Sequence, residues 1–485
     1  MLEIQKKKSN SFFALLSLPA TAMGFGLSVQ ISALSWILST KYGLDIHEIG
    51  IVWAAGPIAG IIAQPIVGTL SDKMWFMGGR RRPWIIIGGI LTAIMLLALP
   101  NLHIVQDVFK ADGPKGLMNI AIAVAVTLDL SINVSFNPTR SLVADCTTKN
   151  ERGKGYTWMQ TVSGTFGVLA YLIAVLWGNE TLIYVGVVVA VLFTLIPIFL
   201  IEEPRILNND EEAESKKSKT TLKDIHDTLL PLYGFLIYGM YAILTMFGVK
   251  LQNAVTIGGI SLNWIETTAI VVQIICMVVV LLNVQRRDKN TFSFQKILLA
   301  HSFTWWGVQT MNIYMFFYVS TVISGLNEGS MQAVNSWAFL VRDLVGAILP
   351  VLVLNEVSKR IGMTRTHNTA IFLMAVGYAL LYLMGANITL FFIYMIVVGI
   401  GWASIVSLPF AIMSEKVDQT KMGLYMGIFN LSVVLPQLVA SFKMGEVVNN
   451  APDKSIIFAI CAVTLLISGV LWVFVGNDKP IKVRK

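Results

Sequence analysis

Long apolar segments alternate with short polar loops from residue 12 to residue 475. A helix needs about 20 apolar residues to cross a lipid bilayer, and the segments have about this length. The first six are 12–37, 47–71, 83–104, 117–144, 155–178 and 181–201, followed by two at 229–248 and 264–283. The last six are 297–323, 332–355, 369–386, 390–413, 421–444 and 454–475. The pattern predicts an all-α polytopic membrane protein with fourteen spans.

The positions of the basic residues test this count. If the N-terminus is cytosolic, every second loop should be rich in lysine and arginine. The loops that fit are those with Lys6, Lys7 and Lys8; Arg80, Arg81 and Arg82; Lys149, Arg152 and Lys154; Arg286, Arg287, Lys289 and Lys296; Lys359, Arg360 and Arg365; and Lys482, Arg484 and Lys485. Loops assigned to the other side, such as 325–330, are nearly free of both. We expect a multi-pass protein of the plasma (inner) membrane with both termini cytosolic, whose first span is retained.

Composition agrees with a chain embedded in a lipid bilayer. Of its 485 residues 55% are hydrophobic and 13% charged, whereas soluble domains carry roughly 25% charged residues. The net charge of +8 comes from short loops that set topology, so we expect no nucleic-acid partner. Cys146, Cys276 and Cys461 show no metal-binding spacing, and no hydrolase, kinase or phosphate-loop motif appears. We predict a monomer that is not an enzyme and has no metal site and no cofactor.

A charged stretch divides the chain. Residues 202–228 are interpreted as a cytosolic linker that follows a six-helix bundle at 1–201. An inserted helix pair at 229–296 precedes a second six-helix bundle at 297–485. Two six-helix halves joined by a cytosolic linker resemble the major facilitator fold, whose halves are repeats. We expect the inserted pair to pack on the outside of the bundle and to have no transport role.

One predicted span carries an unusual polar stripe. Asp129, Asn133, Asn137 and Arg140 fall within roughly 80° of one helical face, at about 100° per residue. A charged side chain at mid-membrane costs roughly 2.5–3.5 kcal/mol on insertion scales, so the stripe indicates a polar path or binding site. The alternative is that a protonated Asp129 hydrogen-bonds a neighbouring helix for packing alone.

Depth along this helix separates the roles of its two ionisable residues. Asp129 lies about 18 Å into the span, where burial disfavours a charged carboxylate and makes reversible protonation possible. Arg140 is about 16 Å further along, so a direct salt bridge between the two is not expected. A sodium site needs several oxygen ligands, and Asp343 is the one other acidic residue deep in a core span. A proton is therefore the favoured coupling ion.

Binding of a sugar needs planar amides or charges for its hydroxyl groups and aromatic faces for its C–H surfaces. The candidates are Gln30, Gln64, Asn133, Asn137 and Gln160 in the first half, and Trp305, Trp306, Gln309, Asn312, Asn335, Trp337, Arg342, Asp343, Trp402, Asn430 and Gln437 in the second. Any one of them could instead be a packing group or a lipid-facing ring. Arg342 and Asp343 are adjacent in sequence, so we expect them not to face each other and one to point inward.

The loop after the second span follows the pattern G-x-x-x-D…G-R-R, which is a signature of facilitators. Its residues are Gly68, Asp72, Gly79, Arg80 and Arg81. We expect a conformational latch here, in which Asp145 at the end of the fourth span is a possible partner of the arginines. The alternative is that the arginines only hold the loop on the cytosolic side.

Four stretches, 53–89, 128–145, 303–317 and 399–440, resemble the sucrose–proton symporters within the glycoside–pentoside–hexuronide cation symporter group, bacterial type. The second stretch, LDLSINVSFNPTRSLVAD, is the most specific. The resemblance implies that Asp129 is the proton site and that Arg140 is essential for sugar coupling. The chain departs from the plant carriers in two ways: MFFYVSTVI lacks the charges found in their seventh core span, and the inserted pair is atypical.

These observations favour a proton-coupled symporter that imports a glycoside, expected to be an α-glucoside disaccharide such as maltose or sucrose, by alternating access. A proton-driven antiporter that exports a small molecule would use the same buried aspartate. A non-transporting membrane sugar sensor is a third hypothesis. Such sensors usually carry a long cytosolic domain, whereas the longest soluble stretch here is near 202–225.

Overall fold

The computed structural model describes residues 9–476 apart from 112, 148, 204–221, 247, 250, 258–259, 283–288 and 418–421. It is almost entirely helical, and eleven helices of this described part are long and apolar enough to cross a membrane. The predicted count of fourteen spans stays a prediction. The chain divides into two compact units: unit 1 is Met1–Asn208 with Leu326–Asp343, and unit 2 is Asn209–Gly325 with Leu344–Lys485.

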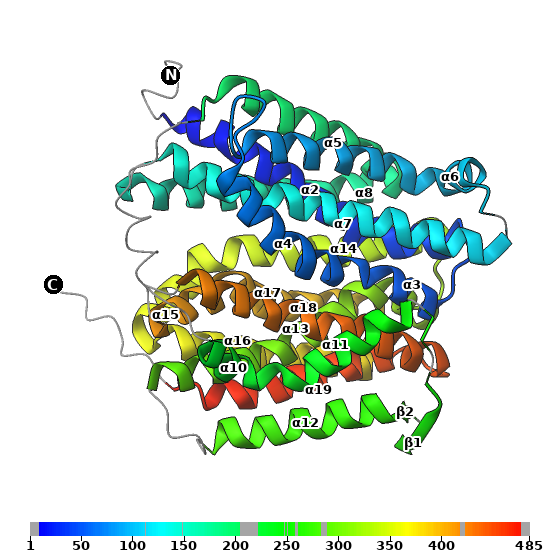
Figure 1. Ribbon diagram of the computed structural model, residues 1–485. Coiled ribbons are helices and arrows are strands. Elements are labelled where there is room, and N and C mark those ends of the chain that lie inside the picture. Colours follow the sequence, from blue (N-terminus) through cyan, green and yellow to red (C-terminus); the bar gives the residue numbers. More distant parts are fainter. Residues whose placement is uncertain are drawn as a thin grey trace. The chain divides into compact units, whose positions relative to one another are not determined.

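Unit 1 is built from long helices, joined by shorter ones, that pack side by side (Figure 1). They are α2 (Asn10–Thr40), α3 (Ile46–Trp53), α4 (Ala55–Lys73), α5 (Arg82–Ala98), η1 (Leu99–Asn101), α6 (Leu102–Phe109), α7 (Gly113–Cys146) and α8 (Lys149–Leu200). The unit also contains most of α14 (Glu328–Leu349). Helix α2 packs on α8, and α7 packs on both α4 and α5. Helix α7 therefore lies at the centre of the contacts that position Asp129.

A glycine divides the longest helix. Gly178 in α8 has φ 87° and ψ 164°, a backbone conformation open to glycine and strained for residues with a Cβ. Two predicted spans, 155–178 and 181–201, fall on either side of it. The two parts of α8 are therefore separate helical segments joined without a loop.

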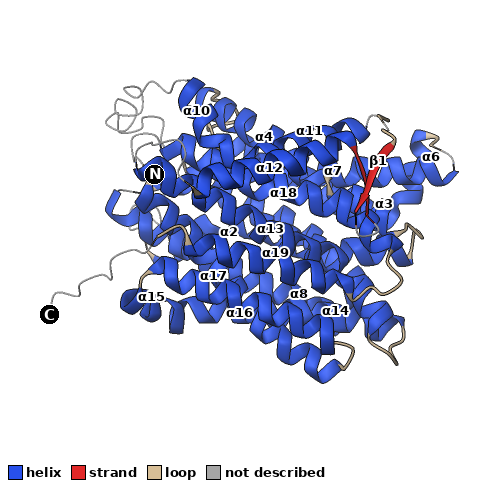
Figure 2. Cartoon of the chain, turned by 90° about the horizontal axis from the view of Figure 1, so that it is seen from below, coloured by secondary structure: helices blue, strands red, loops and turns tan. Residues whose placement is uncertain are grey.

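Unit 2 contains the remaining helices and one small sheet (Figure 2). The elements are α10 (Leu222–Leu229), η2 (Leu230–Leu232), α11 (Tyr233–Met246), β1 (Asn253–Ile257), β2 (Ile260–Asn263), α12 (Trp264–Leu281), α13 (Lys289–Val322), the π-helix η3 (Pro350–Leu354), α15 (Asn355–Ile361), α16 (Met363–Met384), α17 (Ile388–Lys416), α18 (Met422–Asn450) and α19 (Ile456–Val473). Helix α13 packs on α18 and α19, and α16 packs on α17 and α19. Helices α13, α17 and α18 of this group carry the second-half candidates Trp305, Trp306, Gln309, Asn312, Trp402, Asn430 and Gln437, whereas Asn335, Trp337, Arg342 and Asp343 lie on α14 in unit 1.

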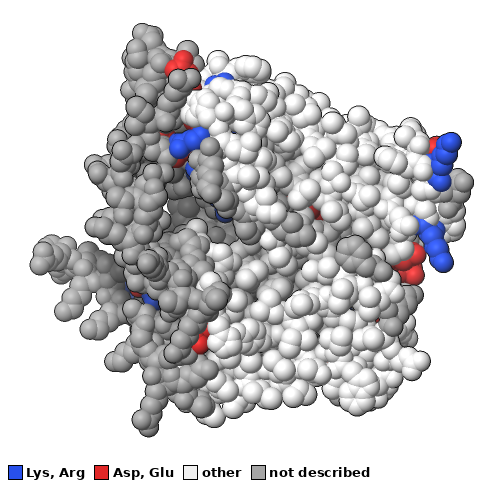
Figure 3. Space-filling view, viewed as in Figure 1, with Lys and Arg blue, Asp and Glu red and all other residues white. Residues whose placement is uncertain are grey.

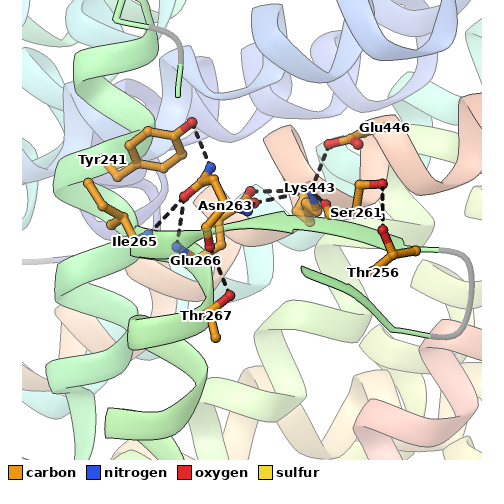
Figure 4. A network of polar contacts seen from close by, with 9 residues as sticks. All are labelled: Tyr241, Thr256, Ser261, Asn263, Ile265, Glu266, Thr267, Lys443 and Glu446. Atoms are coloured by element: carbon orange, nitrogen blue, oxygen red, sulfur yellow. Dashed lines mark hydrogen bonds and ion pairs between the residues drawn. The ribbon is translucent and has the colours of Figure 1, made fainter. Parts of the chain in front are cut away.

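The inserted pair, α11 and α12, is tied to α18 by a polar network (Figure 4). Strands β1 and β2 form an antiparallel hairpin that leads into α12, and α11 packs on α18. Asn263 caps α12 in a capping box with Glu266. The Lys443 ammonium on α18 lies 3.3 Å from the Glu266 carboxylate and 2.8 Å from Glu446, and it also donates to the Ser261 carbonyl. A buried ion pair therefore joins the inserted helix α12 to α18 within unit 2.

Most exposed charges on the face drawn in Figure 3 lie near the ends of the helices. The described lysine, arginine, aspartate and glutamate side chains lie mostly near those ends, and the surface between them is almost entirely uncharged. Exposed leucine, isoleucine, valine and phenylalanine side chains are frequent along the helices, among them Ile94, Leu176 and Val470. Such a band of apolar surface fits hydrocarbon rather than water.

Candidate functional site

Asp129 is buried in unit 1, with 4% of its surface exposed, between helices α2 and α4. The Gln30 side-chain amide on α2 donates a hydrogen bond to the Asp129 carboxylate at 3.0 Å. On α4, Gly56 lies so close that a Cβ added there would be 3.3 Å from Asp129 Oδ1. No ion pair reaches Asp129 from the described residues, so ionisation of this carboxyl would leave a buried charge without a counter-ion.

The other members of the polar stripe lie apart from the carboxyl group. Asn133 donates to the Asp129 backbone carbonyl at 2.8 Å, and its side chain is half-buried. Arg140 is exposed, and its guanidinium lies over the Phe136 ring at 4.3 Å. No ion pair between Arg140 and Asp129 is found among the described side chains, which agrees with their spacing along α7. Asn137 lies on the helix, but its side chain falls outside the described part of the structure.

Asn335 lies in a buried polar cluster of unit 1. Its side-chain amide is 3.5 Å from the Ser32 carbonyl, and the Ser32 hydroxyl contacts Asn179 at 2.9 Å and Ser336 at 3.2 Å. All four side chains are at most 1% exposed. The cluster joins α2, α8 and the first part of α14. Gln30, which donates to Asp129, lies two residues before Ser32, so the same segment of α2 contributes to the cluster and to the surroundings of Asp129.

The side chains of Arg342 and Asp343 contact each other, whereas the sequence predicted that they do not face each other. Arg342 Nε lies 2.7 Å from Asp343 Oδ1, and the Arg342 side chain is fully buried. The long arginine side chain can fold back to its neighbour, which spacing along the backbone does not reveal. The guanidinium lies 4.9 Å from the Phe339 ring centroid, and that ring stacks on Tyr171 of α8. The expectation that these two side chains do not face each other was therefore wrong.

Unit 2 brings several predicted residues together. Trp305 on α13 meets Trp402 on α17 edge to face, with ring centroids 6.2 Å apart. The Gln437 amide on α18 donates to Gln309 on α13 at 3.4 Å. Both indole rings are half-buried, whereas Gln309 is 6% exposed. We call Trp305, Trp402, Gln309 and Gln437 the aromatic–amide cluster.

The remaining predicted residues are distributed over several helices. Asn312 is buried on α13, and Asn430 is half-buried on α18. Trp306 packs against Phe235 of the inserted helix α11, and Trp337 is 41% exposed. Gln160 is exposed on α8. Gln64 lies on α4, but its side chain falls outside the described part.

The arginine-rich loop before α5 in unit 1 has an acidic partner that was not predicted from the sequence. Arg81 Nε lies 3.2 Å and Arg80 Nη2 3.6 Å from Asp145 Oδ2. The Glu203 carboxylate accepts the Arg81 backbone N–H at 3.0 Å, and Arg80 Nε lies 3.7 Å from it. Glu203 thus binds the N-terminus of α5, where a negative charge is favourable. The acidic pair at 202–203, directly after a predicted span, was the available signal.

A Cβ at Gly79 would lie 2.3 Å from the Glu203 carboxylate, so a larger residue there would force the Glu203 side chain to shift. Gly68 and Asp72 lie on α4 at positions whose side-chain surroundings are outside the described part. Among the described residues, no group of three or more histidine, cysteine, aspartate or glutamate side chains could hold a metal ion.

The sequence is similar to sugar carriers over part of its length. A general alpha-glucoside permease of Schizosaccharomyces pombe is 28% identical over 177 residues, which cover 33% of this chain and 32% of the permease. Sucrose transport protein SUC4 of Arabidopsis thaliana is 29% identical over 147 residues, 28% of each chain. The matched stretches span about a third or less of these relatives. The resemblance to sucrose carriers stated from the sequence is confirmed by these matches.

The similar solved structures and the family match both cover most of the chain. The nucleoside transporter NupG superposes with a TM-score of 0.59 at 13% identity, covering 96% of this chain and 100% of that one. The POT family transporter PepTSo gives 0.63 at 11% identity, covering 96% and 98%. Residues 16–441 match the Major Facilitator Superfamily. Because that match covers most of the sequence and the fold is the same, the chain belongs to the Major Facilitator Superfamily.

Proposed function

We propose that this protein is a proton-coupled symporter that imports a glycoside, an α-glucoside disaccharide such as maltose or sucrose, by alternating access. The observation that carries the proposal is the Asp129 carboxyl, buried in a membrane-length helix with a neutral amide as its partner. The alpha-glucoside permease and sucrose transport proteins among its relatives support the choice of cargo.

The proposed cycle uses Asp129 as the proton carrier. A proton taken up from outside neutralises the carboxyl, and the neutral form can remain buried without a counter-ion. Amide groups and indole faces bind the sugar, and release of sugar and proton inside resets the carrier. A membrane potential of 100 mV supplies roughly 2.3 kcal/mol per charge, enough for up to about fiftyfold accumulation.

The direct test replaces Asp129 with asparagine, which keeps the size and removes the titration. In Asp129→Asn we expect no uphill accumulation of labelled maltose or sucrose, because no proton is carried. Exchange of labelled for unlabelled sugar at equal concentrations should persist, since it needs no net proton movement. If the variant still concentrates sugar, the proton assignment is wrong. Asp107→Asn, at an exposed aspartate of α6, is the control and should accumulate normally.

The direction of coupling separates import from proton-driven export. In proteoliposomes, addition of sugar to a symporter draws protons inward, so the external medium becomes alkaline. An antiporter that exports a small molecule gives no such alkalinisation with sugar. Asp129 would serve either carrier, so this measurement decides between them.

A further inference from the structure

A buried histidine that the proposed cycle does not use lies beside the aromatic–amide cluster. His301 on α13 is 2% exposed, and its ring stacks on Phe429 of α18 with centroids 4.6 Å apart. The Trp305 indole N–H donates a hydrogen bond to His301 Nε2 at 2.9 Å. The two residues are four apart on one helix, which places their side chains on the same face.

The direction of this hydrogen bond determines the protonation state and the tautomer of His301. An indole nitrogen can only donate, so His301 Nε2 must accept and cannot carry a proton. The ring is therefore neutral, with its proton on Nδ1. Among the described residues, neither His301 nor His367, the nearby buried histidine on α16, forms an ion pair. His301 thus acts as a fixed acceptor for one indole N–H.

The bond limits what Trp305 can offer to a ligand. Its N–H is occupied by His301, while its half-buried ring remains accessible beside Trp402. An indole with an occupied N–H presents only its π face, which suits the apolar C–H surface of a sugar ring. Gln309, one turn further along α13, and Gln437 supply the amides that a hydroxyl group needs.

We propose that His301 is a positioning residue that holds the Trp305 indole as a stacking surface for a pyranose ring of the transported glycoside. The inference rests on the proposed function for its ligand. It adds that unit 2 recognises the sugar by an oriented aromatic face, and that His301 acts through Trp305 without touching the sugar.

Two substitutions at His301 separate positioning from packing. His301→Gln retains a side-chain oxygen that can accept the indole N–H, so the KM for exchange of labelled maltose or sucrose should stay within about twofold of wild type. His301→Leu removes the acceptor, and its KM should rise about tenfold, equivalent to about 1.4 kcal/mol. The maximal exchange rate should change little. An unchanged KM in His301→Leu would overturn the proposal, as would equal losses in both variants.

A double-mutant cycle links the effect to Trp305. If His301 acts only through the indole, Trp305→Phe in the His301→Leu background should add little to the rise in KM. Additive effects of the two changes would contradict this. The buried His367 provides a matched control, because its Nδ1 pairs with the Ser404 hydroxyl at 2.7 Å and its ring faces Trp472. His367→Gln should lower thermal stability and leave the KM within about twofold.

A measurement without sugar keeps this inference separate from the proposed function. In protein labelled with ¹⁵N-tryptophan, the Trp305 indole N–H resonance reports its hydrogen bond directly. The resonance should shift in His301→Leu and stay near its original position in His301→Gln. If the resonance responds in this way but the wild type exchanges no glycoside, the proposed substrate is wrong. The hydrogen bond between Trp305 and His301 is then still confirmed. If it does not respond, the positioning role fails whatever the cargo.

Discussion

Asp129 and Gly56 illustrate how much the site depends on single atoms. The carboxyl on α7 lies against the Gly56 backbone on α4, and the Gln30 amide reaches it from α2. Small residues such as glycine allow two helices to approach this closely. The acid was predictable because its charge stands out in an apolar span. Its glycine neighbour was not, because the sequence does not show which helices touch.

Replacement of Gly56 by alanine tests this close approach. The added methyl would lie 3.3 Å from Asp129 Oδ1, so the carboxyl must shift, and overpacking of this kind costs about 1–3 kcal/mol. We expect proton-driven sugar uptake by Gly56→Ala to fall about three- to tenfold at a similar amount of folded protein. Gly24→Ala is the matched control on α2, because its Cβ would meet Ser163 at an ordinary 3.7 Å. Equal uptake by both variants would show that the contact does not matter.

Helices α11 and α12 were predicted from the sequence, but the contacts around them were not. Their lengths follow from hydropathy, but the hairpin between them was not predicted. A signal was present, since Gly258 and Gly259 separate two short runs of the kind that form hairpin strands. The pairing of Lys443 with Glu266 could not be foreseen, because the residues are far apart in sequence. His301 was also missed, since a single histidine in an apolar span has no distinctive spacing.

Loss of Lys443 should destabilise unit 2. The Lys443 and Glu266 side chains are 7% and 8% exposed, and removal of one partner of a buried ion pair typically costs about 3–5 kcal/mol. We expect a clear loss of thermal stability in Lys443→Met, because the buried Glu266 carboxylate loses its partner. Addition of Glu266→Gln to this variant should recover part of the loss, because it removes the unpaired charge. This is measurable as the melting temperature of the purified protein in detergent.

The matched control is an exposed ion pair in the same unit. Lys359 and Glu356 are 3.6 Å apart with side chains 45% and 54% exposed, and such pairs contribute about 0–1 kcal/mol. Lys359→Met should therefore melt close to wild type. If Lys443→Met also melts close to wild type, the ion pair does not hold the insert.

For the whole molecule, hydropathy and basic loops were enough to predict the helical membrane class and the facilitator fold. They could not show which helix faces meet lipid and which meet protein, because both surroundings are apolar. Asn335 is an example of a helix face that the sequence did not assign. It was a candidate for sugar binding in the second half, and it lies in a buried cluster with Ser32 of α2. The proposed orientation in the membrane rests on the basic loops alone.

Accessibility to a membrane-impermeant maleimide tests that orientation in intact cells. Cysteine at Asn327, in a loop predicted outside, should be labelled from the external medium. Cysteine at Met77, which is 64% exposed in the arginine-rich loop, should be labelled only after the membrane is opened. The native Cys146, Cys276 and Cys461 are free and buried, so background labelling should be low. The reverse pattern would invert the topology.

The Lys443–Glu266 pair has a consequence for anyone who seeks a minimal carrier. Excision of 229–296 would look harmless on a hydropathy plot, because an even number of crossings is lost and the second half keeps its orientation. Yet Lys443 would lose Glu266 and the Ser261 carbonyl together, and of these three partners its ammonium would keep Glu446. We therefore expect a shortened chain to fold better with an uncharged residue at 443.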